Sequence, residues 1–114
     1  MKVNDKAVKH AKNLIENGDY SVDTDWSKAQ PSTDKENKFI DDNGWDDYSK
    51  WFLGVNKDDD KDEKQRYGFP FGDFKKVHRS GLIAAKQRAA QNDHSDIESA
   101  ADELLEKIDN KEGK

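Results

Sequence analysis

The C-terminal half of the chain contains two adjacent segments that decide its fold. The first, "YGFPFGDFKKVHRSGLIAAKQRAAQ", covers Tyr67–Gln91, and the second, "SDIESAADELLEKID", covers Ser95–Asp109. Apolar residues in the second segment recur with the spacing of one helix face: Ile97, Ala100, Ala101, Leu104, Leu105 and Ile108. Only three residues separate the segments, and the first is rich in small alanines. We therefore predict an antiparallel helical hairpin, Asp73–Gln91 packed on Ser95–Asp109.

Two further helices are predicted in the N-terminal half. Apolar residues recur at helical spacing over Asn4–Asn17, and the following Gly18 favours a helix end. A second helix is expected over Thr33–Asn43, because Thr33 and Glu36 have the spacing of a capping box. The same capping pattern, Ser95 with Glu98, is expected to begin the last helix.

Aromatic residues are concentrated in the middle of the chain. Nine of the eleven lie between Phe39 and Phe74, which predicts an aromatic core with helices packed around it. After a short helix that begins near Trp45, the segments Phe52–Val55 and Gly68–Phe71 are candidates for a short two-stranded element. The fold class that follows is mostly α: a small helical domain over residues 1–110, with residues 111–114 as a disordered C-terminal tail.

Composition limits the class of protein. The chain has 114 residues, of which 39% are charged and 32% hydrophobic, so a single domain with a modest core is expected. It has neither an apolar stretch of the roughly 20 residues that a membrane span needs nor the apolar centre of a signal peptide at its start. We therefore expect a cytoplasmic protein without membrane contact, and a monomer.

Residues that could carry catalysis or bind a metal are sparse. The chain has no cysteine, and its three histidines lack the paired spacing of metal ligands. Asp58, Asp60 and Asp62 alternate as in a calcium loop, but Glu63 stands where that loop needs glycine and Phe69 where it needs glutamate. We therefore predict no metal, no cofactor and no catalytic residue, and the protein is not expected to be an enzyme.

Charge is distributed unevenly along the chain. The net charge is −5, yet the segment 74–92 carries +5 and the rest of the chain −10. The segment 93–110, which contains the last helix, carries −6. The basic residues therefore either neutralise the acidic helix across the hairpin or form a surface for a phosphate group or an acidic partner. This candidate binding surface consists of Lys75, Lys76, Arg79, Lys86 and Arg88.

The segment 67–97 combines a Tyr-x-x-Pro-x-x-Asp stretch, a Val-x-Arg element, an alanine-rich helix and a glutamine. These motifs are formed by Tyr67, Pro70, Asp73, Val77, Arg79, Ala84, Ala85 and Gln91, with Ile97 at the start of the next helix. With these motifs the segment resembles part of the head-maturation proteins of tailed phages, which lie near prohead proteases or are fused to them. The whole chain is also similar to small stand-alone bacterial proteins. No residue of this chain matches a protease nucleophile or base. The resemblance therefore implies a small helical module that binds a partner and does not catalyse a reaction.

Together these observations lead to two expected functions. The first is a non-enzymatic interaction module, with a protein as partner and a phage ancestry. The alternative is a nucleic-acid-binding module that uses the basic residues of the segment 75–88.

Overall fold

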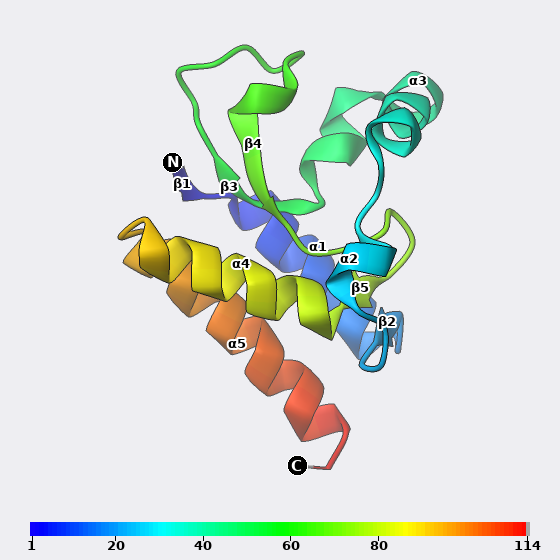
Figure 1. The fold of residues 1–114 in the computed structure, drawn as a ribbon, viewed down its shortest axis with the longest axis vertical. Coiled ribbons are helices and arrows are strands. Elements are labelled where there is room, and N and C mark those ends of the chain that lie inside the picture. Colours follow the sequence, from blue (N-terminus) through cyan, green and yellow to red (C-terminus); the bar gives the residue numbers. More distant parts are fainter. Residues whose placement is uncertain (114) are drawn as a thin grey trace.

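The computed structural model describes residues 1–113 and shows helices packed around two small sheets (Figure 1). The helices are α1 (Asp5–Glu16), α2 (Trp26–Ala29), α3 (Thr33–Ser49), α4 (Arg79–Gln91) and α5 (Ser95–Lys111), with a single 3-10 turn, η1 (Lys64–Arg66). The strands are β1 (Lys2–Val3), β2 (Tyr20–Ser21), β3 (Phe52–Val55), β4 (Tyr67–Pro70) and β5 (Val77–His78). Within the described residues, no helix is long and apolar enough to cross a membrane.

The predicted hairpin of α4 and α5 is confirmed, and it forms one side of the core (Figure 1). Its turn is closed by a hydrogen bond of 2.8 Å from the His94 N–H to the Ala89 carbonyl, with Asp93 in the left-handed region. Helix α1 packs against α5. The three helices bury a shared set of small and branched residues: Ala7, Ala11, Ile15, Leu82, Ala85, Ala89, Ile97, Ala101, Leu104 and Ile108. The small alanines let the helix axes approach closely.

Several helix ends differ from the expected positions. The run α3 consists of two helical stretches joined at a kink, because Gly44 adopts the non-helical φ 85° and ψ 171°. The predicted helix end at Asn43 and the short helix that begins near Trp45 are therefore confirmed. The cap of α3 is Ser32, one residue before the expected Thr33, and its hydroxyl accepts from the Lys35 N–H at 3.2 Å. The residue that caps α5 is likewise one earlier than expected: His94 instead of Ser95, with no side-chain hydrogen bond to the helix. The same helix runs on to Lys111, so this first residue of the expected tail is helical, whereas residue 114 lies outside the described part.

The two sheets are small and their strands are short. Strands β3 and β4 pair antiparallel, with Phe52 opposite Pro70, which confirms the predicted two-stranded element. Strand β1 pairs antiparallel with the other edge of β3, so this sheet has three strands in the order β1-β3-β4. Strands β2 and β5 form a separate parallel pair. The sequence did not predict β1, β2 or β5, because two residues are too few to show the alternation of a strand.

The aromatic core is confirmed and links the helices to the sheets. Tyr48, Trp51, Phe52 and Phe71 are all buried, and the ring centroids of Tyr48 and Phe52 lie 4.6 Å apart. Trp51 contacts Phe71 with ring centroids 6.0 Å apart, which connects the end of α3 to the segment after β4. This packing places the loop after β4 against α3, where the candidate site is found.

Candidate functional site

The turn between β4 and β5 is held by the side chain of Asp73. Its carboxylate accepts hydrogen bonds from the N–H groups of Lys75 and Lys76, at 3.0 and 2.8 Å, and its own N–H donates to the Lys76 carbonyl at 3.1 Å. Asp73 was expected to begin a helix, but it closes this turn instead, and α4 begins six residues later at Arg79. The turn leaves both lysines exposed.

The same carboxylate also contacts a buried histidine. Nε2 of His78 lies 2.9 Å from Asp73, and only 3% of the His78 side chain is exposed. Because a carboxylate only accepts, we assign Nε2 as the donor, which leaves the buried Nδ1 without a hydrogen-bond partner among the described residues. Burial alone would raise the pKa of Asp73, but the hydrogen bonds from His78, Lys76 and Lys75 outweigh it and lower the pKa. Asp73 is therefore ionised and fixed in place at neutral pH.

Phe74 anchors this turn to helix α3. It has φ 69°, in the left-handed region that bulky side chains rarely adopt. Its ring stacks on Phe39 of α3, with centroids 4.4 Å apart and planes 11° from parallel. This stacking compensates for the backbone strain and places two half-buried rings beside the lysines of the turn.

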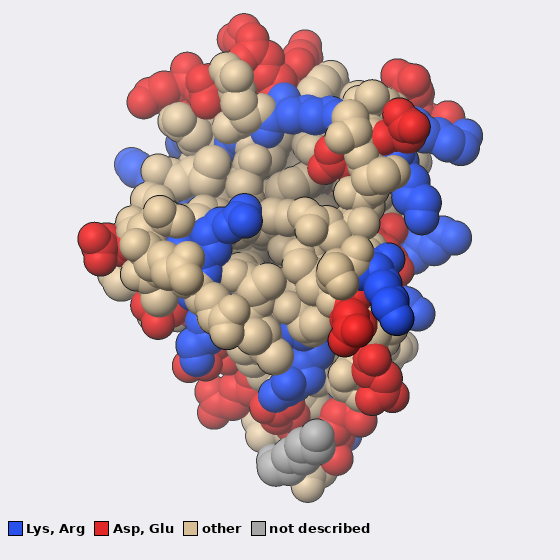
Figure 2. Space-filling view, in the orientation of Figure 1, with Lys and Arg blue, Asp and Glu red and all other residues tan. Residues whose placement is uncertain are grey.

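A cleft of about 570 Å³ opens over these rings, between α2, α3 and the turn. Five lysines line it, and we call it the lysine cleft: Lys28, Lys35, Lys38, Lys75 and Lys76. The only carboxylates in its lining are those of Asp42, which pairs with Lys38 at 3.1 Å, and Asp73. The ammonium groups of the other four lysines have no hydrogen-bond or ion-pair partner among residues 1–113. Figure 2 shows a run of Lys and Arg side chains along the edge where Figure 1 places α3 and α2.

The structure brings together only two of the five residues of the candidate basic surface. Lys75 and Lys76 line the lysine cleft. Arg79 instead forms a two-point ion pair with Asp109, at 2.9 and 3.3 Å, and Lys86 pairs with Asp102 at 2.7 Å. Arg88 lies beside a separate small depression next to Trp26. Two of the basic residues of α4 thus neutralise α5 across the hairpin, as one of the two alternatives anticipated.

Three lysines of the cleft were not predicted from the sequence as part of a binding surface. Lys28 lies on α2, and Lys35 and Lys38 lie on α3, some 40 residues before the turn that they face. Nothing in the local sequence distinguishes them from other surface lysines. The packing of Phe74 on Phe39 and Tyr48 brings α3 to the turn.

The ion pair between Arg79 and Asp109 leads to a stability prediction. Because both side chains are about one-third exposed, at 32% each, replacing Arg79 with methionine should lower the free energy of unfolding by no more than about 1 kcal/mol. The loss should shrink in about 1 M salt, where charges are screened over about 3 Å. Urea unfolding at low and high salt would measure both effects. The matched change Arg88→Met removes no ion pair among residues 1–113 and should leave stability unchanged. A loss of stability in Arg79→Met that does not depend on salt would contradict this account.

Comparison with known proteins identified no relative. No family model, no curated protein sequence and no solved structure matches the chain. A function is therefore inferred from the residues of the lysine cleft.

Proposed function

We propose that the protein is a non-enzymatic interaction module that holds an acidic segment of a partner protein in the lysine cleft. The observation that carries the proposal is a group of four ammonium groups around one cleft that have no hydrogen-bond or ion-pair partner in the described part of the chain: Lys28, Lys35, Lys75 and Lys76. Several positive charges around one cleft favour an anion between them. The carboxylates of an acidic segment would supply that anion.

The rest of the surface favours a short acidic ligand over a long one. The chain has a net charge of −5, and α5 and the segment 58–63 present many carboxylates to solvent. A polyanion that extends beyond the cleft would meet these charges, whereas a short acidic segment of a protein would not. The stacked rings of Phe39 and Phe74 line the cleft, so an apolar side chain next to the acidic residues would find a contact there.

A nucleic acid is the alternative partner, and one observation favours it. Aromatic rings next to lysines are the usual components of sites for single-stranded nucleic acid. In the alternative first derived from the sequence, the segment 75–88 supplies the phosphate contacts. Because Arg79 and Lys86 are engaged with α5, this alternative now depends on the lysine cleft. The phage ancestry remains a prediction.

Fluorescence anisotropy with a labelled peptide tests the proposal. The probe is a short peptide of glutamates around one central phenylalanine. Reversing two charges, in Lys75→Glu with Lys76→Glu, should weaken its binding by about tenfold or more, which corresponds to about 1.4 kcal/mol. The matched control, Lys2→Glu with Lys9→Glu, makes the same change in net charge at exposed lysines outside the cleft. It should change the affinity much less.

Two results would contradict the proposal. Equal losses in both double variants would show that the peptide responds to the overall charge and not to the cleft. Tight binding of an oligothymidine probe with a steep dependence on salt, together with weak binding of the peptide, would favour the nucleic-acid alternative.

A further inference from the structure

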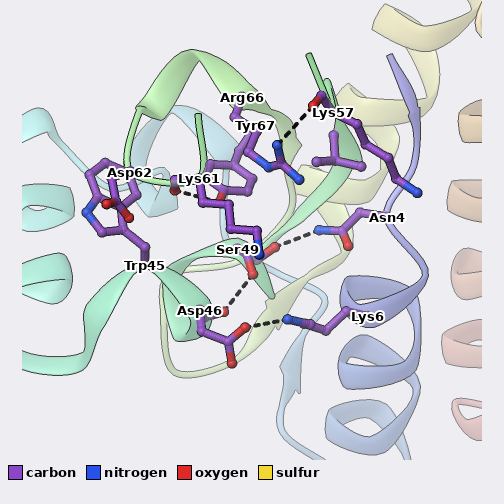
Figure 3. A pocket seen from close by; sticks show the side chains of 11 residues that line it. Asn4, Lys6, Trp45, Asp46, Ser49, Lys57, Lys61, Asp62, Arg66 and Tyr67 are labelled. Carbon is purple, nitrogen blue, oxygen red and sulfur yellow. Dashed lines mark hydrogen bonds and ion pairs between the residues drawn. The ribbon is translucent and has the colours of Figure 1, made fainter. Parts of the chain in front are cut away.

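A second cavity, of about 470 Å³, lies on another part of the molecule (Figure 3). Its walls come from the start of the chain, the second half of α3 and the loop between β3 and β4. It shares no residue with the lysine cleft. Its size is within the range of small-molecule sites, which is about 300–1,000 Å³.

Cationic side chains converge in this cavity. Figure 3 shows Lys6, Lys61 and Arg66 extending toward its middle, with Lys57 on the far side from Trp45. Arg66 uses one of its terminal nitrogens to donate to the carbonyls of Asp59 and Lys57, at 2.5 and 3.3 Å. The Arg66 side chain also interacts with the Tyr67 hydroxyl. The ammonium groups of Lys61 and Lys57 have no hydrogen-bond or ion-pair partner among the described residues.

Two carboxylates also line the cavity, and one of them is already engaged. Asp46 forms an ion pair with Lys6. The hydrogen bond from Lys6 and its charge, with smaller contributions from Lys50 and Lys61, lower the pKa of Asp46. Asp62 forms no ion pair among the described residues. Among the residues that line the cavity, Lys57, Lys61 and Arg66 therefore supply the cationic excess, and Asp62 works against it. The same three cations also border a separate depression that contains Asp58, Asp59, Asp60 and Glu63, which do not line the cavity.

The other end of the cavity is aromatic. The rings of Trp45 and Tyr67 are half-buried, with centroids 6.4 Å apart and planes 24° from parallel. Buried Tyr48 contacts both rings edge-on, at 5.5 and 5.7 Å, and so holds them in place. The hydroxyl of Tyr67 donates to the Lys61 carbonyl at 2.8 Å, which ties the aromatic wall to the loop that carries the cations.

Polar groups lie between the two ends. The amide nitrogen of buried Asn4 donates to the carbonyls of Ser49 and Phe52, at 2.8 and 3.0 Å. The Ser49 hydroxyl donates to the Asp46 carbonyl at 2.6 Å. The Asn4 side-chain oxygen and the Ser49 hydroxyl oxygen retain acceptor capacity, which suits the hydroxyl groups of a sugar.

From this arrangement we infer that the cavity binds a nucleoside monophosphate. Its phosphate lies against Lys61 and Arg66, and its base stacks on Trp45 and Tyr67. Each part of the ligand meets the chemistry it requires: cations for the phosphate, acceptors for the ribose and ring faces for the base. Binding at this site is independent of the acidic partner proposed for the lysine cleft.

Calorimetric titration of the whole protein with AMP tests this inference, with adenosine and ribose 5-phosphate as comparison ligands. AMP should bind saturably, with a dissociation constant below about 1 mM, and more tightly than either comparison ligand. Lys61→Met should weaken AMP binding by about tenfold, because it removes one charge-assisted contact to the phosphate. Lys9→Met, at an exposed lysine outside the cavity, should leave the affinity unchanged. Thermal melts of both variants verify that they fold.

A second variant tests the site in the opposite direction. Asp62→Asn removes from the cavity a carboxylate that forms no ion pair with residues 1–113, and it should tighten AMP binding several-fold. The double variant Lys75→Glu with Lys76→Glu should have no effect on AMP, which separates this inference from the proposed function. The inference is overturned by any of three results: no saturable binding of AMP, equal affinity for AMP and either comparison ligand, or an AMP affinity that Lys61→Met does not change.

Discussion

Replacing Leu104 with alanine is expected to lower the free energy of unfolding by about 2–5 kcal/mol. Leu104 is fully buried in the core shared by α1, α4 and α5. The substitution removes apolar surface from that core and leaves a cavity that the close-packed alanines around it cannot fill. For a domain with about 5–15 kcal/mol of total stability, this is a large fraction.

Urea unfolding followed by circular dichroism measures this loss. Leu14→Ala is a suitable control, because Leu14 lies on α1 and is only half-buried. It should cost clearly less than Leu104→Ala. An unchanged unfolding midpoint for Leu104→Ala would show that α5 does not pack as described.

Replacing Gly72 with alanine is the second large effect that we expect. A Cβ atom at this position would lie 2.5 Å from two ring atoms of Trp51 and 2.7 Å from the Lys76 carbonyl oxygen. Trp51 is buried and the Lys76 carbonyl closes the Asp73 turn, so neither can move freely. Overpacking of this kind costs about 1–3 kcal/mol and occasionally more. Because the turn carries Lys75 and Lys76, the substitution should also weaken binding in the lysine cleft.

A double-mutant cycle identifies the cause of the Gly72 effect. In a Trp51→Leu background the clash is reduced, so Gly72→Ala should cost less there than in the wild-type protein. Gly18→Ala is the control: Gly18 has φ 81° and no atom within 4 Å of a Cβ, so its cost comes from the backbone alone. That cost should be the same in both backgrounds. Strict additivity of Gly72→Ala and Trp51→Leu would contradict the close approach of Trp51.

The sequence predicted those elements whose apolar pattern is long and local. The buried apolar face of α5 runs from Ile97 to Ile108, and that of α1 runs from Ala7 to Ile15, so both helices were predicted within a few residues of their ends. Strands β3 and β4 were predicted from short apolar and aromatic runs. In each case the signal lies within the segment that forms the element.

The remaining features depend on contacts between distant segments. Asp73 has the sequence signature of a helix cap, yet it closes a turn, because Val77 and His78 pair with β2 and so delay the start of α4. Strand β1 exists only because β3 offers an edge to it. No local pattern reports such pairings, since their cause is the tertiary packing itself.

The candidate site also depends on contacts between distant segments. Its lysines come from α2, α3 and the turn after β4, which are far apart in the sequence. Charge counting found the basic segment 74–92 but could not show that Arg79 and Lys86 face α5 whereas Lys75 and Lys76 face α3. The direction in which a side chain points determines its partner. The net charge of a segment does not show that direction.

The central claim is that the lysine cleft receives an acidic segment of a partner, and one measurement tests it most directly. Amide chemical shifts of the labelled protein are recorded while the glutamate-rich peptide is added. We predict that the largest shifts occur at Lys35, Phe74, Lys75 and Lys76, around the cleft, and that they saturate. Shifts that are largest on the outer faces of α4 and α5, or the absence of any saturable shift at the cleft, would contradict the claim.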